Sequence, residues 1–124
     1  MPDQADIERF IASTFRSVWD LELLLELKRS AGDPMTRDQL VSALRASEVV
    51  VSRGVETLVA SGLAAEDSDG SVHYAPAGPG LDELAAGAVE LYRSRPDSVR
   101  RLIIAGIPGG LAAFSDAFRI KGDK

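Results

Sequence analysis

Few side chains in this sequence could carry out acid–base, nucleophilic or metal chemistry. The 124 residues include no cysteine and one histidine, which excludes a thiolate nucleophile and a thiolate metal site. His73 lies between Val72 and Tyr74 in an alternating stretch, where a solvated strand residue is more common than a metal ligand or a catalytic base. The acids of "DSDG" at 67–70 belong to a turn in water. We therefore expect a protein that is not an enzyme and has no metal or cofactor.

The glycine-rich stretch "GIPGG" at 106–110 does not have the residues of a phosphate-binding loop. Such a loop needs a lysine and a hydroxyl residue after its glycines, and neither stands here. We interpret the stretch as a break between helices.

Charge is distributed unevenly along the chain, whose net charge is -5. Residues 36–62 hold three basic and three acidic side chains, residues 63–92 hold six acids and no lysine or arginine, and residues 93–124 hold seven bases and three acids. Because neutralising phosphates requires a basic surface, this distribution argues against non-specific coating of nucleic acid.

The bulk composition predicts one domain in the cytoplasm. A hydrophobic content of 45% is enough for one core and an appended element. "MPDQADIERF" carries acids where a secretory leader would carry lysine or arginine, and no apolar run is long enough to span a bilayer. The absence of cysteine permits a reducing compartment.

Apolar residues recur at helical spacing over most of the chain. Ile7, Phe10 and Ile11 mark a short N-terminal helix. "SVWD" from Ser17 has the capping-box pattern, so a second helix starts there, and its many leucines predict that neighbours surround it. We expect Trp19 to pack among them.

Two further helices are joined by a tight connection. Thr36 and Gln39 form a second capping box, and Ser47 is placed to cap "EVVVSRGVETLVAS", which ends at Gly62. The expected buried stripe of this last helix is Val51, Val55, Leu58 and Val59. This spacing is typical of a helix-turn-helix.

After Gly62 the apolar period changes from 3.6 to 2. "LAAE" and "SVHYAP" flank the turn "DSDG", which predicts a small β-hairpin. The sequence thus indicates a mainly α chain with one hairpin.

Residues 17–78 resemble the winged helix-turn-helix of bacterial regulators of the MarR and related types, chiefly in "VETLVASGLAAEDSDGSVHYAP". In that family this stretch holds a recognition helix ending in glycine, a leucine that opens the first wing strand, and a charged wing tip. The resemblance implies a winged helix-turn-helix domain at 17–78 with an N-terminal helix at 1–16 and a C-terminal helical extension at 79–124. It also implies transcriptional regulation through DNA binding by a dimer.

On this resemblance the DNA contacts fall on six side chains. Arg53 would read guanine in the major groove, and Arg37 and Arg45 would hold phosphates. The complete set is Arg37, Arg45, Ser47, Ser52, Arg53 and Thr57.

The acids near this surface favour an alternative function. Glu48 and Glu56 would face phosphates, and the wing carries Glu66, Asp67 and Asp69 without a base. The alternative is a winged-helix protein-protein interaction adaptor that does not bind DNA. Exposure of Val49 or Val50 would favour it further.

Apolar stripes at both ends of the chain predict a homodimer. A winged helix of this size has no evident room for them, and terminal helices of MarR-like proteins dimerise. The stripes consist of Ile7, Phe10 and Ile11 at one end, and of Leu81, Leu84, Ala85, Ala88, Leu91, Tyr92, Leu102, Ile103, Ile104, Ile107, Leu111, Phe114 and Phe118 at the other.

A third hypothesis places the C-terminal arginines at an anionic membrane surface. Arg93, Arg95, Arg100 and Arg101 accompany an amphipathic segment, although acids dilute their charge.

Overall fold

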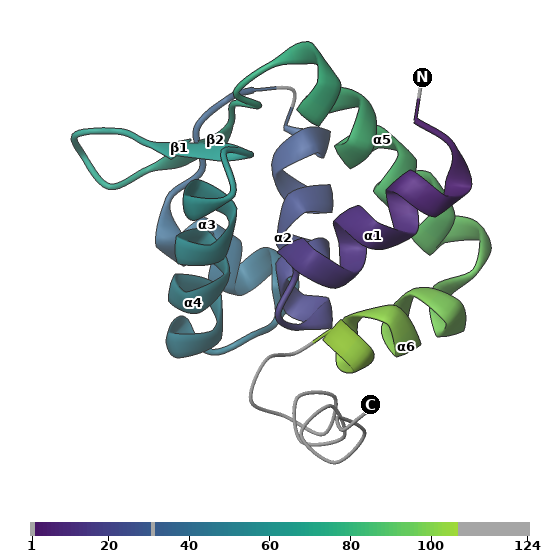
Figure 1. Cartoon of the computed structure of the whole chain (residues 1–124). Coiled ribbons are helices and arrows are strands. Elements are labelled where there is room, and N and C mark those ends of the chain that lie inside the picture. The colour runs from purple at the N-terminus through teal and green to yellow at the C-terminus, as the bar shows by residue number, and fades with distance from the viewer. Residues whose placement is uncertain (1, 31, 107–124) are drawn as a thin grey trace, which may run out of the picture.

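The computed structural model describes residues 2–30 and 32–106. This part of the chain is mainly helical, with one antiparallel pair of short strands, so the predicted mainly α fold with a small hairpin is confirmed (Figure 1). In chain order the elements are α1 (Gln4–Thr14), α2 (Val18–Arg29), α3 (Arg37–Leu44), α4 (Glu48–Ala60), β1 (Ala64–Glu66), β2 (Val72–Tyr74), α5 (Pro79–Ser94) and α6 (Pro96–Gly106).

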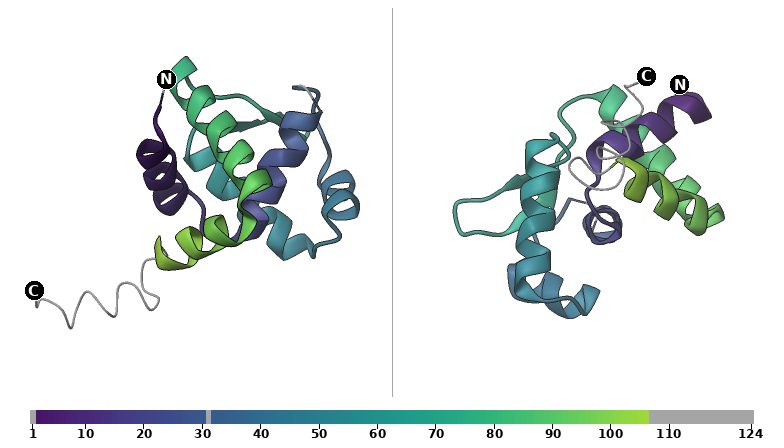
Figure 2. Two further views of the ribbon diagram at one scale, coloured as in Figure 1. Left: turned by 90° about the vertical axis from the view of Figure 1, so that its right-hand side faces the viewer. Right: turned by 60° about the horizontal axis from the view of Figure 1, so that its bottom comes forward.

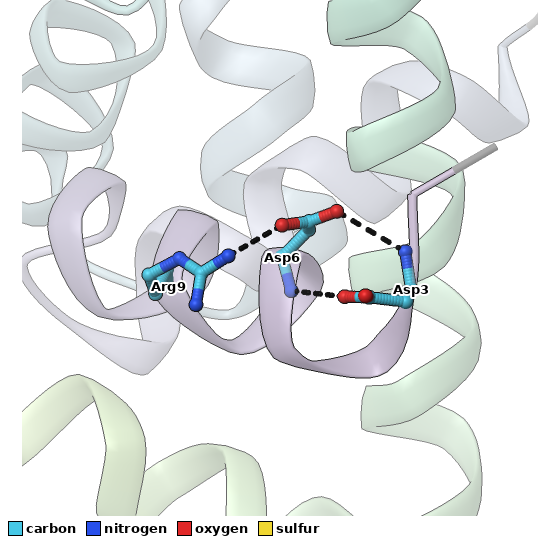
Figure 3. A network of polar contacts seen from close by, with 3 residues as sticks. All are labelled: Asp3, Asp6 and Arg9. Atoms are coloured by element: carbon cyan, nitrogen blue, oxygen red, sulfur yellow. Dashed lines mark hydrogen bonds and ion pairs between the residues drawn. The ribbon is translucent and has the colours of Figure 1, made fainter.

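A capping box of two aspartates starts α1. The Asp3 carboxylate accepts a hydrogen bond from the Asp6 amide at 2.8 Å, and the Asp6 carboxylate accepts one from the Asp3 amide at 3.3 Å (Figure 3). Arg9, one turn later, pairs with Asp6. These contacts satisfy amides that the first turn leaves without helical partners.

The start of α2 depends on one buried acid. The Asp20 carboxylate accepts hydrogen bonds from the backbone amides of Arg16 at 2.7 Å and Ser17 at 3.2 Å. Asp20 is 3% exposed, so this acid is part of the core as well as a cap. It fixes the direction in which the chain turns from α1 into α2.

The hairpin pairs the two predicted strands. Ala64 lies opposite Tyr74 and Glu66 opposite Val72, and the turn closes through the Gly70 amide, which donates to the Asp67 carbonyl at 2.9 Å. Gly70 has φ +88, a backbone conformation that favours glycine. Val72 also exchanges two backbone hydrogen bonds with Met35, at 2.8 and 2.9 Å, which ties the hairpin to the segment before α3.

Helix α2 lies between two groups of elements, as Figures 1 and 2 show. On one side it contacts α3, α4 and β2, and on the other side α1, α5 and α6 pack against one another. Its leucines at 21, 23, 24 and 27 are at most 1% exposed, as expected for a helix with neighbours on several sides. Full burial of each contributes about 1.5–3 kcal/mol.

The stripes at the two ends of the chain are buried largely within one copy. Ile11 and Phe15 of the N-terminal part and Ala88, Val99 and Ile103 of the C-terminal part are at most 2% exposed, because α1 packs on both α5 and α6. For the described residues, the apolar stripes that a second copy was expected to cover are therefore covered within one chain, by the terminal helices themselves. The expected stripe residues Ile107, Leu111, Phe114 and Phe118 lie outside the described residues.

Among the described residues, no helix combines the length and the hydropathy that crossing a bilayer requires.

Candidate functional site

A three-residue connection sets the start of α4 relative to α3. Arg45 caps α3 in the left-handed conformation, with φ 54 and ψ 41, and its amide donates to the Val41 carbonyl. Ser47 then caps α4, its hydroxyl oxygen accepting from the Val50 amide at 3.1 Å. Both are predicted DNA-contact residues, and the structure places both at exposed positions in the turn.

Arg37 and Ser52 contact each other instead of standing apart on the surface. The Arg37 guanidinium donates to Ser52 Oγ and to Glu66 Oε2, each at 2.9 Å, and so joins α3, α4 and β1. This ion pair is partly exposed, so its contribution to stability is modest, about 0–1 kcal/mol. The carboxylate of Glu66 also neutralises the charge of an arginine that was expected to hold a phosphate.

The other two predicted residues, Arg53 and Thr57, line one groove. This α4 groove has a volume of about 610 Å³ and runs between α4 and the α1–α2 junction. Its lining from α4 is Val50, Arg53, Glu56, Thr57 and Ala60, and its lining from the junction is Arg16, Ser17, Trp19 and Asp20.

The Trp19 side chain is more exposed than the leucine-rich sequence of α2 predicts. The side chain was expected to pack among the leucines of α2, but Trp19 is 40% exposed and forms part of the wall of the α4 groove. Periodicity could not distinguish these positions, since the leucines that follow Trp19 fall on more than one face of the helix. The capping box was the available signal: Trp19 stands two positions after the cap residue Ser17, in the first turn of the helix, where fewer neighbours cover a side chain.

The outer face of α4 carries exposed apolar side chains. Val49 is 59% exposed. The sequence predicted that exposure at this position would favour a protein partner. Val59 is 39% exposed, so its assignment to the buried stripe is wrong, whereas Val51, Val55 and Leu58 are buried as expected. Exposed apolar side chains of this kind are suited to contact with another protein.

The hairpin presents three carboxylates, and two of them lie next to a basic side chain. Glu66 meets Arg37, as described above, and Asp67 Oδ1 lies 3.3 Å from Nδ1 of the half-buried His73. Asp69 accepts a hydrogen bond from the Ser71 amide at 3.0 Å, which lowers the pKa of its carboxyl and keeps it ionised at neutral pH. The hairpin therefore presents negative charge beside α4.

Two tyrosine hydroxyls donate hydrogen bonds to carboxylates of neighbouring elements. Tyr74 donates to Asp82 Oδ1 at 2.6 Å, and Tyr92 of α5 donates to Glu22 of α2. Burial, followed by the acceptor carboxylate, raises the pKa of each phenol, so both remain protonated donors. Neither lies in the α4 groove, and we assign both to packing.

Within the described ranges, no three histidine, aspartate or glutamate side chains are grouped so that they could hold a metal ion.

Comparison with protein-family models, with curated protein sequences and with solved structures finds no match to this chain. The resemblance to MarR-type regulators therefore stays a hypothesis from the sequence pattern, and function has to be argued from the surface of α4 and the hairpin.

Proposed function

We propose that residues 17–78 form a winged helix-turn-helix that acts as a protein-interaction adaptor, with the exposed face of α4 as its contact surface. The order of three helices and a hairpin, and the three-residue connection between α3 and α4, support the winged-helix assignment. Fold alone does not decide what such a domain binds, because function depends on the residues at the surface.

The exposure of Val49 carries this proposal. A valine that is 59% exposed at the first turn of α4, with the half-exposed Trp19 across the groove from the same helix, gives a partner protein apolar area to bury. Burying apolar area contributes about 25 cal/mol per Å², and aromatic residues are enriched in protein interfaces.

Charge supports the same choice. Arg37 is neutralised by Glu66, and the hairpin carries the acids Glu66, Asp67 and Asp69 without a lysine or arginine. A DNA phosphate would approach this side against repulsion, whereas a basic patch on a protein partner would be attracted.

Affinity capture with matched variants tests the adaptor function. The tagged chain is used to capture partners from cells, with and without nuclease, in parallel with Val49→Asp and with Ser42→Asp, a change at an exposed position of α3. We expect a partner protein that survives nuclease, is retained by Ser42→Asp and is lost with Val49→Asp, since an unpaired carboxylate would be buried at the interface. Partners that disappear with nuclease would contradict the adaptor function.

A DNA-binding transcriptional regulator is the second candidate, and one observation favours it. Arg45 and Arg53 are exposed and form no ion pair with the described residues, so two guanidinium groups near α4 are available to DNA. Arg37 would join them only after leaving Glu66. This function therefore predicts that Glu66→Gln strengthens DNA binding.

A further inference from the structure

The α4 groove has the dimensions of a site for a short peptide segment. Its volume of about 610 Å³ lies within the range of about 300–1,000 Å³ that is common for ligand sites in proteins. The stretch of α4 from Val50 to Ala60 that lines it rises about 15 Å, which an extended peptide of about five residues would span. Because α2 packs against α4, the two walls of the groove belong to elements that hold each other in place.

The exposed charges of the groove are mainly positive. Arg16 and Arg53 line it from opposite walls, both are exposed, and neither forms an ion pair with any described residue. Glu56 is the exposed acid of the lining, whereas the carboxylate of Asp20 is buried at 3% exposure and accepts hydrogen bonds from two backbone amides. Two guanidinium groups therefore stand against one available carboxylate, in a chain whose net charge is -5. This local excess of positive charge attracts an acidic segment.

Apolar side chains line both walls as well. Trp19 is 40% exposed in one wall, and Val50 and Ala60 line the other. Aromatic rings attract one another beyond the area that they bury, and tryptophan is enriched at the centres of protein interfaces. The side chain that fits between these walls is therefore aromatic.

We infer that the α4 groove binds a short acidic segment of a partner protein, in which carboxylates flank an aromatic side chain. The aromatic ring packs on Trp19, and the carboxylates pair with the guanidinium groups of Arg16 and Arg53. Glu56 repels such a segment in part. This specificity rests on the proposed adaptor function, because a partner protein supplies the segment. The acidic hairpin is a separate surface, which attracts basic side chains elsewhere on the same partner.

Selection from a random peptide library on the immobilised full chain tests this specificity without knowledge of the partner. We expect enriched peptides that carry aspartate or glutamate on both sides of an aromatic residue. Enrichment of basic peptides, of peptides without acids, or of no peptide would overturn the inference.

Single substitutions in the groove measure the charge preference with an enriched peptide that contains no tryptophan. Its affinity is followed through the emission of Trp19, the only tryptophan in the chain. Arg53→Gln is expected to weaken binding about tenfold, because it removes a hydrogen bond between charged groups. Glu56→Gln is expected to strengthen binding about two- to fivefold, because it removes a repulsion. Such a gain of affinity does not arise from partial unfolding.

Arg101→Gln is the matched control for these variants. It removes the same charge as Arg53→Gln at an exposed position of α6 that does not line the groove. The peptide should bind this variant and the parent with the same affinity. Equal affinities for the parent, Arg53→Gln and Glu56→Gln would overturn the groove as the binding site.

Competition with oligothymidine distinguishes a peptide site from a site for single-stranded nucleic acid, whose bases stack on exposed aromatic side chains. The oligonucleotide is added to the bound peptide at low salt. We expect no displacement, because the groove pairs one carboxylate with its two guanidinium groups and the chain is acidic overall. Displacement at concentrations comparable to those of the peptide would overturn the inference and assign the groove to single-stranded nucleic acid.

Affinity capture with Val49→Asp separates this specificity from the adaptor function itself. A nuclease-resistant partner that is lost with Val49→Asp, together with no enriched acidic peptide, would overturn the specificity of the groove and leave the adaptor function standing. Acidic peptides that bind as predicted, without any nuclease-resistant partner, would support the specificity of the groove and contradict the adaptor function.

Discussion

Asp20 caps the start of a helix, and its buried carboxyl also makes the stability of the fold depend on pH. Its carboxylate accepts from the Arg16 and Ser17 amides, and its burial at 3% exposure removes it from water. Burial raises the pKa of this carboxyl, and the two amides oppose the rise in part. The native state therefore holds a proton on Asp20 more tightly than the unfolded chain does.

The sign of the resulting pH dependence follows from proton binding. Between the ordinary pKa of an aspartate, about 3.9, and the raised native pKa, the native state binds more protons than the unfolded state, so the free energy of unfolding falls as pH rises through that interval. We expect Asp20→Asn to remove this fall. As pH rises from about 3.5 to 7, the parent should therefore lose unfolding free energy relative to Asp20→Asn.

Urea denaturation across this pH range measures the shift. The constant offset from losing part of the cap does not affect it, since the comparison concerns only the change with pH. Asp33→Asn, at an exposed position, is the control. A difference between Asp20→Asn and the parent that stays constant with pH would show that the buried carboxyl does not titrate differently in the native state.

At the scale of elements, the crossing of α2 and α4 depends on a glycine. A Cβ at Gly54 would lie 2.9 Å from Leu23 Cδ2 and 3.3 Å from Asp20 Oδ1, and both of these side chains are buried. The absence of a side chain at this position lets the two helices approach, and it holds the groove-lining face of α4 at its distance from Trp19.

We expect Gly54→Ala to destabilise the fold despite the better helix propensity of alanine. Overpacking costs about 1–3 kcal/mol, and the propensity gain returns about 1 kcal/mol, so the expected net loss is up to about 2 kcal/mol. Gly80→Ala in α5 is a suitable control, because no atom lies within 4 Å of its added Cβ. Denaturation midpoints that fall equally for both variants, or for neither, would contradict the close crossing.

Local signals in the sequence predicted the elements, and contacts distant in sequence decided the surface. Thr36 and Ser47 cap the expected helices, and Gly62 takes the left-handed conformation with φ +78. The pairing of Arg37 with Glu66, 29 positions apart, had no local signal, because only the tertiary fold brings α3 and β1 together. The sequence therefore indicated where the six predicted DNA-contact residues lie on α3, α4 and the turn. It did not indicate which of them form contacts with other side chains of the same chain.

For the whole molecule, the packing of α1, α5 and α6 removes the reason for expecting these helices to form a dimer interface. Their stripes cover one another in a single copy, which leaves Ile104, at 60% exposure, as the large apolar side chain of α6 that faces solvent. The sequence could not anticipate this, because periodicity identifies an apolar face without naming what covers it. We therefore assign the terminal helices to the core of one chain.

The central claim, that this surface recognises protein instead of DNA, is tested most directly by selection from a genomic DNA library at low salt, with the parent chain, Arg53→Ala and Glu66→Gln. Low salt favours any electrostatic attraction to phosphate, so it gives DNA binding its best chance. We predict no enriched sequence for any of the three proteins. An enriched motif that binds about 1–3 kcal/mol more weakly to Arg53→Ala, and more tightly to Glu66→Gln, would contradict the adaptor function and establish α4 as a DNA-reading helix.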